Sequence, residues 1–252
     1  MVKILLHGCN GKMGRMITEI VKSDENTEIV AGVDTYMEIP NDYPVYGSIE
    51  KCDADADVAV DFSNAGAVDA LLDYCVERGL PVVLCTTGLS ERQLQKVAEA
   101  SKKTAVLKSA NMSLGINLLL KLLQDAAKVF GPAGYDVELV ERHHNQKLDA
   151  PSGTALALAD SVNKALNNEY HYVYDRSQIR QKREKKEIGI SAVRGGTIVG
   201  DHEVIFAGTD EVIEFKHTAY SRSVFAKGAV EAGKFLAGKA PGMYDMEDVV
   251  GL

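Results

Sequence analysis

The residues best suited to chemistry lie in one polar stretch, residues 141–155, with the sequence ERHHNQKLDAPSGTA. Adjacent histidines at the end of a strand point to opposite faces, so we expect one imidazole of His143 and His144 to exchange a proton and the other to bind or support. Lys147 adds a positive charge beside them. The stretch therefore predicts proton transfer next to an anionic substrate.

The second half of this stretch is typical of a helix start that binds an anion. Asp149 or Ser152 can cap the helix, and Gly153 and Thr154 would then offer free backbone amides to a carboxylate. Arg194 ends a later strand, in the sequence Arg-Gly-Gly-Thr, and its guanidinium could grip a second carboxylate. We expect a substrate with one or two carboxylates.

Neither the histidines nor the cysteines favour a metal site. Two neighbouring imidazoles rarely bind one ion together, and no third histidine or cysteine lies at a ligand spacing. The four cysteines form no C-x-x-C pair, which excludes the common zinc and dithiol motifs. Scattered thiols of this kind are typical of a reducing compartment, so we expect no metal and a cytoplasmic protein. They are Cys9, Cys52, Cys75 and Cys85.

A second motif, near the N-terminus, is typical of a nucleotide site. The run follows an expected strand and opens an expected helix: Gly8-Cys9-Asn10-Gly11-Lys12-Met13-Gly14. Glycines permit a tight turn in which a pyrophosphate contacts the helix N-terminus. Such spacing also suits a plain sharp turn, but Asp34, 20 residues beyond Gly14, is placed to bind a ribose diol. The combination favours a nicotinamide dinucleotide.

The sequence leaves the choice between NADH and NADPH open. Thr35 stands where an arginine would grip a 2′-phosphate, which favours NADH, whereas Lys12 in the glycine turn could reach that phosphate. Two more strand ends fall at the edge where open α/β sheets bind ligands, although each also suits a plain turn. These are Cys85-Thr86-Thr87-Gly88 and Ser109-Ala110-Asn111-Met112.

The elements that must position these motifs follow two patterns. In the first half, short apolar runs alternate with segments of helical period, as expected for βαβ units and a parallel sheet covered on both faces. The expected strands are 2–6, 28–33, 58–62, 81–85 and 105–107, and the expected helices are 13–22, 65–78 and 91–102. This half predicts a Rossmann-type α/β domain.

A second domain is expected to begin after residue 112. We predict a long helix over 114–129, a strand at 135–141, a helix at 154–165 and strands at 188–193, 203–207 and 212–217. Glycine turns between the later strands favour largely antiparallel or mixed pairing. A last helix, 223–236, is expected to pack back on the first domain. We therefore expect a dinucleotide-binding domain of 1–112 with 220–252, and an α+β domain of 113–219.

Composition excludes several functional classes. The chain has 252 residues, of which 46% are hydrophobic, and a net charge of −8, which disfavours nucleic acid and anionic membranes. No apolar run approaches the length of a membrane span. Residues 180–187 carry five basic and two acidic side chains. We interpret this run as a solvated loop, with attraction of an anionic substrate as the alternative.

Taken together, the motifs closely resemble the 4-hydroxy-tetrahydrodipicolinate reductase family, formerly called dihydrodipicolinate reductases. The resemblance covers essentially the whole chain and rests most strongly on Glu-x-His-His-x-x-Lys-x-Asp-Ala-Pro-Ser-Gly-Thr-Ala. The matching residues are 8–14, 86–88, 109–115, 141–155, 194–200 and His202.

The resemblance implies NAD(P)H-dependent reduction of a cyclic imine dicarboxylate on the diaminopimelate route to lysine. It also implies a central domain with an open mixed sheet that carries the substrate and assembles a homotetramer. His143 and Lys147 would be catalytic, and His144, Gly153 and Thr154 would bind substrate. The cofactor would contact Gly8, Cys9, Asn10, Gly11, Lys12, Met13, Asp34, Cys85, Thr86, Thr87, Ser109, Ala110, Asn111 and Met112. Cys85 stands where many relatives have glycine, so its contact would use the backbone.

Two other functions share some of these features. Another two-domain Rossmann dehydrogenase of amino-acid metabolism would carry the glycine turn without the His-His-x-x-Lys stretch. A non-catalytic dinucleotide sensor would bind the cofactor without oxidising it. Activity with freshly generated substrate separates all three.

Overall fold

The structure is a computed structural model that describes residues 1–109 and 111–251. It divides into two compact units, Met1–Leu114 with Ser223–Leu252, and Gly115–Arg222. These limits lie a few residues from the predicted ones, at 112 and 220. We describe each unit by itself.

The first unit is built on a seven-stranded sheet in the order β12-β6-β5-β4-β1-β2-β3. All its strand pairs are parallel, so the carboxyl ends of the strands share one edge. Strand order reverses next to β1, which is where ligands bind in open α/β sheets. The strands are β1 (Val2–His7), β2 (Thr27–Val33), β3 (Val45–Tyr46), β4 (Val58–Asp61), β5 (Val82–Leu84), β6 (Ala105–Leu107) and β12 (Gly242–Tyr244).

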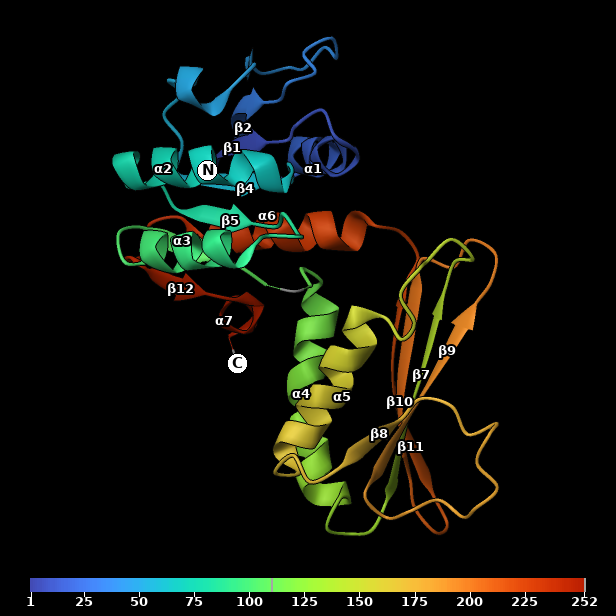
Figure 1. Cartoon of the computed structure of the whole chain (residues 1–252). Helices are drawn as coiled ribbons and strands as arrows, with labels where there is room; N and C mark the ends of the chain where they lie inside the picture. The colour runs from blue at the N-terminus through green and yellow to red at the C-terminus, as the bar shows by residue number, and fades with distance from the viewer. Residues whose placement is uncertain (110, 252) are drawn as a thin grey trace. The chain divides into compact units, whose positions relative to one another are not determined.

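Helices cover both faces of this sheet, because its strands are apolar on both sides (Figure 1). Along β1, Ile4 and Leu6 pack with α1 and α6, whereas Leu5 packs with α2 and α3 on the other face. The elements are α1 (Lys12–Lys22), α2 (Ala65–Arg78), α3 (Glu91–Ser101), α6 (Ser223–Leu236), α7 (Met246–Val250) and a 3-10 turn, η1 (Ile49–Lys51).

Sequence reasoning missed the two edge strands of this sheet. β3 and β12 have only two and three residues, too few to show a period. β12 pairs with β6 and brings the C-terminal segment into the sheet. The prediction that 223–236 packs on the first domain is confirmed, since Ala226, Ala229 and Val230 are buried in the core shared with Ile4 and Ile17.

The second unit has a five-stranded sheet in the order β11-β10-β7-β9-β8, which is mixed as expected. β7 pairs antiparallel with β10 and parallel with β9. Helices α4 and α5 pack on one face (Figure 1). The elements are α4 (Leu114–Phe130), β7 (Asp136–His143), α5 (Gly153–Ala165), β8 (His171–Val173), β9 (Glu187–Arg194), β10 (Gly200–Ala207) and β11 (Val212–Ala219).

One connection in this unit differs from the expectation. Residues 195–199 do not form a tight hairpin, because β7 lies between β9 and β10 in the sheet. The glycines of this segment let the chain cross the end of β7: Gly195 N–H donates to the carbonyl of His143, at 2.9 Å. The crossing brings Arg194 and His202 to the end of β7, next to His143, which was predicted to be catalytic.

The basic run at 180–187 is only partly the solvated loop we expected. Most of its side chains are exposed, but that of Arg183 is 17% exposed and lies against β7. Its guanidinium donates to Glu138 at 2.9 Å and to Asp136 at 2.8 Å. Arg183 thus has a structural role in holding the loop to the sheet.

Across the part of the chain that the structure describes, every helix is too short or too polar to cross a bilayer.

Candidate active site

The glycine turn between β1 and α1 can be built only from glycines at two positions. Gly8 has a φ of +81°, and a Cβ there would lie 2.6 Å from the Phe62 carbonyl oxygen. A Cβ at Gly14 would lie 2.3 Å from the Gly8 carbonyl oxygen. Gly11 is the N-cap of α1 and offers no side chain to its first amides. Those amides are therefore available to an anion at the positive end of the helix.

Asp34 lies beside this turn, at the end of β2. Its carboxylate accepts hydrogen bonds from the backbone N–H groups of Asn10, at 2.9 Å, and Tyr36, at 3.0 Å. The side-chain amide of Asn10 also donates to the Tyr36 carbonyl. These bonds connect Asn10 of the glycine turn with Asp34, so the two parts of the predicted cofactor motif lie side by side. Each carboxylate oxygen keeps a further lone pair for a ribose hydroxyl.

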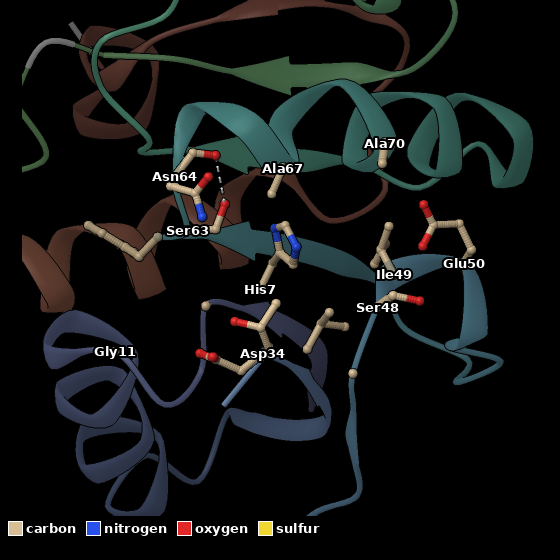
Figure 2. Close-up of a pocket in the computed structure, with 15 residues that line it drawn as sticks. His7, Gly11, Asp34, Ser48, Ile49, Glu50, Ser63, Asn64, Ala67 and Ala70 are labelled. Atoms are coloured by element: carbon tan, nitrogen blue, oxygen red, sulfur yellow. Dashed lines mark hydrogen bonds between the residues drawn. The ribbon is translucent and has the colours of Figure 1, made fainter. Parts of the chain in front are cut away.

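A pocket of about 380 Å³ opens along this edge, within the usual size range of ligand sites. Figure 2 shows His7 in its middle, with Asp34 and Gly11 on one side and Asn64 and Ala67 of the α2 start on another. A glycine cradle, free helix amides and an adjacent acidic residue fit a dinucleotide. The side chains that line the pocket include two carboxylates, Asp34 and Glu50, and no lysine or arginine among the described residues.

Sequence reasoning missed His7. Its Nδ1 lies 2.8 Å from Asp61 Oδ1, and the same oxygen accepts from the Ser63 hydroxyl at 2.6 Å. Asp61 is fully buried, so it fixes the ring that lines the pocket. The signal that could have found His7 is its place directly before Gly8, at the carboxyl end of β1.

The other expected cofactor residues follow three strands of the same sheet. Cys9 is buried, and burial, assisted by Asp34, raises the pKa of its thiol to about 12, which makes it chemically inert. Lys12 is exposed at the start of α1. After β5, Cys85 is half-buried, Thr86 buried and Thr87 exposed.

After β6, the loop toward α4 is closed by local hydrogen bonds. The Ser109 hydroxyl donates to the Asn111 carbonyl at 3.1 Å, and Asn111 Oδ1 accepts from the Ser113 N–H at 2.8 Å. Met112 is buried in the core. Ala110 lies outside the described residues.

A second polar centre lies in the other unit, where β7 ends. The carboxylate of Glu141 is fully buried and receives four hydrogen bonds. His143 Nδ1 lies 2.6 Å from Oε2, and Arg194 donates to both oxygens at 2.7 Å. The backbone N–H of Ser152 completes the set at 3.0 Å. His143, predicted to be catalytic, is thus held by Glu141, which our sequence reasoning did not select.

The start of α5 joins this centre. Of the two predicted caps, Asp149 and Ser152, the structure has Ser152 as the N-cap. Its hydroxyl accepts a hydrogen bond from the Ala155 N–H at 3.1 Å. The same hydroxyl lies 3.0 Å from His202 Nε2. Gly153 and Thr154 form the first two positions of α5. Their backbone groups therefore lie at the positive end of the helix, next to the His143 cluster.

His144 and Lys147 lie outside the buried network. His144 is half-buried, and Lys147 Nζ lies 2.8 Å from Asp149 Oδ1. The hydrogen bond from Lys147 lowers the pKa of Asp149. The expectation that Arg194 binds a substrate carboxylate is not supported, because both Nη atoms of its guanidinium donate to Glu141.

Charge and burial set the protonation of this centre. Burial alone would raise the pKa of Glu141, but hydrogen bonds from Arg194 and His143 outweigh it and lower that pKa. Burial, reinforced by the nearby His143, lowers the pKa of His202 to about 4. Glu141 is therefore ionised and His202 neutral at pH 7.

A group of possible metal ligands lies elsewhere in this unit, at His171, Glu184 and Glu187. Glu187 is already paired with the guanidinium of Arg176. The arrangement is that of an ion-pair network on the rim of the sheet.

Comparison with known proteins gives full-length matches. Sequence models of the N-terminus and C-terminus of dihydrodipicolinate reductase match residues 2–112 and 115–250. A 4-hydroxy-tetrahydrodipicolinate reductase of Caldanaerobacter subterraneus subsp. tengcongensis is 51% identical over 250 residues, covering 99% of this chain and 98% of that protein. The enzyme of that name from Clostridium novyi is also 51% identical over 250 residues, with the same coverage.

A solved structure matches over the same extent. The dipicolinate-bound dihydrodipicolinate reductase of Paenisporosarcina sp. TG-14 has a TM-score of 0.80 and 25% identity, covering 98% of this chain and 99% of that chain.

Proposed function

The chain belongs to the dihydrodipicolinate reductase family and reduces 4-hydroxy-tetrahydrodipicolinate with NADH or NADPH in lysine biosynthesis, and we propose that one of its polar centres binds the cofactor and the other binds the substrate and supplies a proton. The observation that carries the substrate assignment is the buried Glu141–His143 pair beside the start of α5. The glycine turn with Asp34 carries the cofactor assignment.

The reaction releases the 4-hydroxyl group together with one ring hydrogen as water, and adds one hydride and one proton to ring carbons. When bound, the reduced nicotinamide supplies the hydride. The substrate is a dicarboxylate, and the Paenisporosarcina relative binds the dicarboxylate dipicolinate. The protein must therefore hold two negative groups and provide a proton.

In the unit formed by residues 115–222, His143 supplies the proton. An imidazole suits this step because its ordinary pKa lies close to neutral pH. Lys147 and His144 contact the substrate from the loop after β7, and Lys147 also provides a cation for a carboxylate. Gly153 and Thr154 present the amides of the α5 start to the second carboxylate.

In the other unit, the cofactor is held at the edge of the parallel sheet. The amides of Lys12 and Met13 would face the pyrophosphate, and Asp34 would accept hydrogen bonds from a ribose. Thr86, Thr87 and the loop at Ser109, Asn111 and Met112 follow neighbouring strands and would complete the site. Cys85 would contribute its backbone carbonyl, because its N–H is bonded to the Asp61 carbonyl at 3.0 Å. The role of Ala110 rests on the resemblance alone.

The first experiment tests the proton donor. We expect His143→Gln to lower kcat roughly 100-fold, the usual size of a general-acid contribution, with little change in cofactor affinity. The assay follows NADH oxidation with freshly generated substrate, and cofactor affinity is measured by titration. His171→Gln is the matched control, because its ring is 54% exposed and lies at the far end of β9 from Arg194.

A His143→Gln enzyme with near wild-type kcat would remove His143 from this role. A wild-type protein that binds NADH but fails to oxidise it with this substrate would instead support the sensor function.

We further propose that the enzyme is a homotetramer assembled through the open face of its five-stranded sheet. Helices α4 and α5 cover only one face (Figure 1), and Val193, which points away from them, is 45% exposed. Light scattering of the purified protein should give four times the chain mass of 27.3 kDa. A monomeric mass would contradict the proposal.

We also propose a cytoplasmic location. Its support is the four free cysteines, three of them buried, which suit a reducing compartment. Cell fractionation with an antibody tests it, and recovery outside the cytoplasm would contradict it.

A further inference from the structure

We propose that Glu141 and Arg194 form a positioning pair that keeps a proton on Nδ1 of His143 and leaves Nε2 as the nitrogen that exchanges a proton with the substrate. The inference rests on the proposed role of His143. It adds two residues that do not touch the substrate and act through the imidazole.

Strand geometry brings the three side chains together. Glu141 and His143 are two residues apart on β7, so they point to the same face of the sheet. β9 runs parallel to β7, and its register places Arg194 beside His143. From that position the guanidinium reaches back to both oxygens of Glu141 at 2.7 Å.

Arg194 is itself fixed by the backbone. Its Nη1 donates to the Val193 carbonyl at 2.8 Å, and its Nη2 donates to the Asp149 carbonyl at 2.6 Å. A bidentate grip leaves the carboxylate of Glu141 one orientation. The Ser152 N–H holds the same carboxylate from the start of α5. The position of the imidazole is therefore determined by β7, β9 and the α5 start together.

The protonation of Glu141 decides the tautomer. An ionised carboxylate only accepts hydrogen bonds, so at 2.6 Å the Nδ1 of His143 must be the donor. In the neutral ring the proton then resides on Nδ1, and Nε2 carries the lone pair. In the charged ring, Nε2 also carries a proton that it can give away.

The space around Nε2 supports this assignment. A Cβ on Gly200 would lie 3.2 Å from Nε2, so the glycine keeps that end of the ring open. The His202 ring stands edge-on to His143, with ring centres 5.1 Å apart. Its own Nε2 is engaged with Ser152. The groups that face His143 are therefore Glu141, Arg194, Gly200 and the neutral His202.

The proton balance of the step is simple. Nε2–H gives its proton to the substrate carbon, and the electron pair of that bond stays on Nε2. Nδ1 keeps its proton throughout, and Glu141 stays ionised. Solvent then returns a proton to Nε2 for the next turnover. Without Glu141 the ring can rotate, and the charged ring that gives its proton from Nε2 loses the carboxylate that stabilises it.

The kinetic test is Glu141→Gln, whose amide keeps the size of the side chain but can donate to Nδ1. We expect kcat to fall roughly 10- to 100-fold, within the range of a lost general acid, while KM for NADH stays within about twofold. Glu169→Gln is the matched control. Glu169 is an exposed glutamate of the same unit and pairs with Lys186. Its kcat should stay within about twofold of wild type.

A double variant and an NMR spectrum of the wild-type protein distinguish a loss of positioning from a folding defect. Glu141→Gln with Arg194→Met removes the arginine that would otherwise be left buried without its partner, and it should show the same loss of kcat. In wild-type protein labelled with ¹⁵N-histidine and kept at a pH where the ring is neutral, the signal that His143→Gln removes should show the proton on Nδ1.

Two results would overturn the inference: a double variant with wild-type kcat, or a neutral His143 protonated on Nε2. If His143→Gln lowers kcat while the double variant does not, only the positioning pair is refuted. If His143→Gln leaves kcat unchanged, the proposed function of His143 is lost as well.

Discussion

At the scale of single residues, the pocket that we propose for the cofactor carries more negative charge than its glycine motif indicates. Asp34 and Glu50 both line it, and His7 is the one lining side chain among the described residues that can become cationic. His7 is paired with Asp61. Lys12, which left the cofactor choice open, is exposed at the start of α1 and does not line the pocket.

This charge leads to a prediction about cofactor preference. We expect kcat/KM to be about tenfold or more higher with NADH than with NADPH, because a 2′-phosphate would meet two carboxylates and no arginine. Asp34→Ala should lower the ratio of kcat/KM with NADH to kcat/KM with NADPH. The change would weaken NADH binding and would remove the repulsion between the carboxylate and the 2′-phosphate of NADPH. Steady-state kinetics with both cofactors at matched substrate measures it.

Glu38→Gln is the control, since Glu38 is exposed on the same loop and does not line the pocket. Equal kcat/KM values with NADH and NADPH in the wild-type enzyme would show that the two carboxylates do not determine the cofactor preference.

At the scale of elements, α6 closes the first unit by packing tightly on the loop that follows β6. A Cβ at Gly228 would lie 1.7 Å from the Met112 carbonyl oxygen. At Gly233, on the same helix, a Cβ would make ordinary contacts of 3.5 Å with Val60 and 3.6 Å with Val58. The helix therefore contacts the loop proposed to bind the cofactor closely at Gly228, whereas Gly233 makes only ordinary packing contacts.

The two glycines form a matched pair for experiment. Gly228→Ala should push the Met112 loop away and raise KM for NADH several-fold, together with a loss of stability of roughly 1 to 3 kcal/mol typical of overpacking. Gly233→Ala should keep the KM and equal or exceed wild-type stability, because alanine favours a helix. Kinetics and urea unfolding measure both. An unchanged KM in folded Gly228→Ala would show that the loop does not depend on the helix.

At the scale of the whole molecule, each unit has its own core and can respond separately to solvent conditions. In the unit of residues 115–222, we expect His202 to contribute strongly to the acid dependence of stability. This ring is 5% exposed, and burial lowers its pKa to about 4 from an ordinary value near 6.5. Between these two values the unfolded chain binds a proton that the folded unit does not.

His202 makes its full contribution to the free energy of unfolding above about pH 6.5. That contribution, about 3 kcal/mol, is lost as the pH falls toward 4. We expect His202→Gln to flatten this slope, although it also costs stability at neutral pH. Urea unfolding followed by circular dichroism at several pH values measures it, since the chain has no tryptophan.

His171→Gln, at an exposed histidine of the same unit, should keep the wild-type slope. A His202→Gln protein with an unchanged slope would assign the acid sensitivity to other groups, such as Glu141 and His217, whose pKa values are also lowered.

The sequence by itself determined the local elements and the two motifs. Hydrophobic period located α2 and β6 at their observed limits, and glycine spacing predicted the turn between β1 and α1 that lies beside Asp34. Period two also places Glu141 on the same face as His143, a signal that was present and not used. These features depend on residues close together in the chain, so their spacing is enough to reveal them.

Only the tertiary structure decided which distant side chains meet. Placing β7 between β9 and β10 brings Arg194 to Glu141, 53 residues away, and His202 to Ser152, 50 residues away. Two-residue and three-residue edge strands likewise form only because a neighbouring strand accepts their hydrogen bonds. Strand order depends on contacts between residues far apart in the chain, and no local period in the sequence reports it.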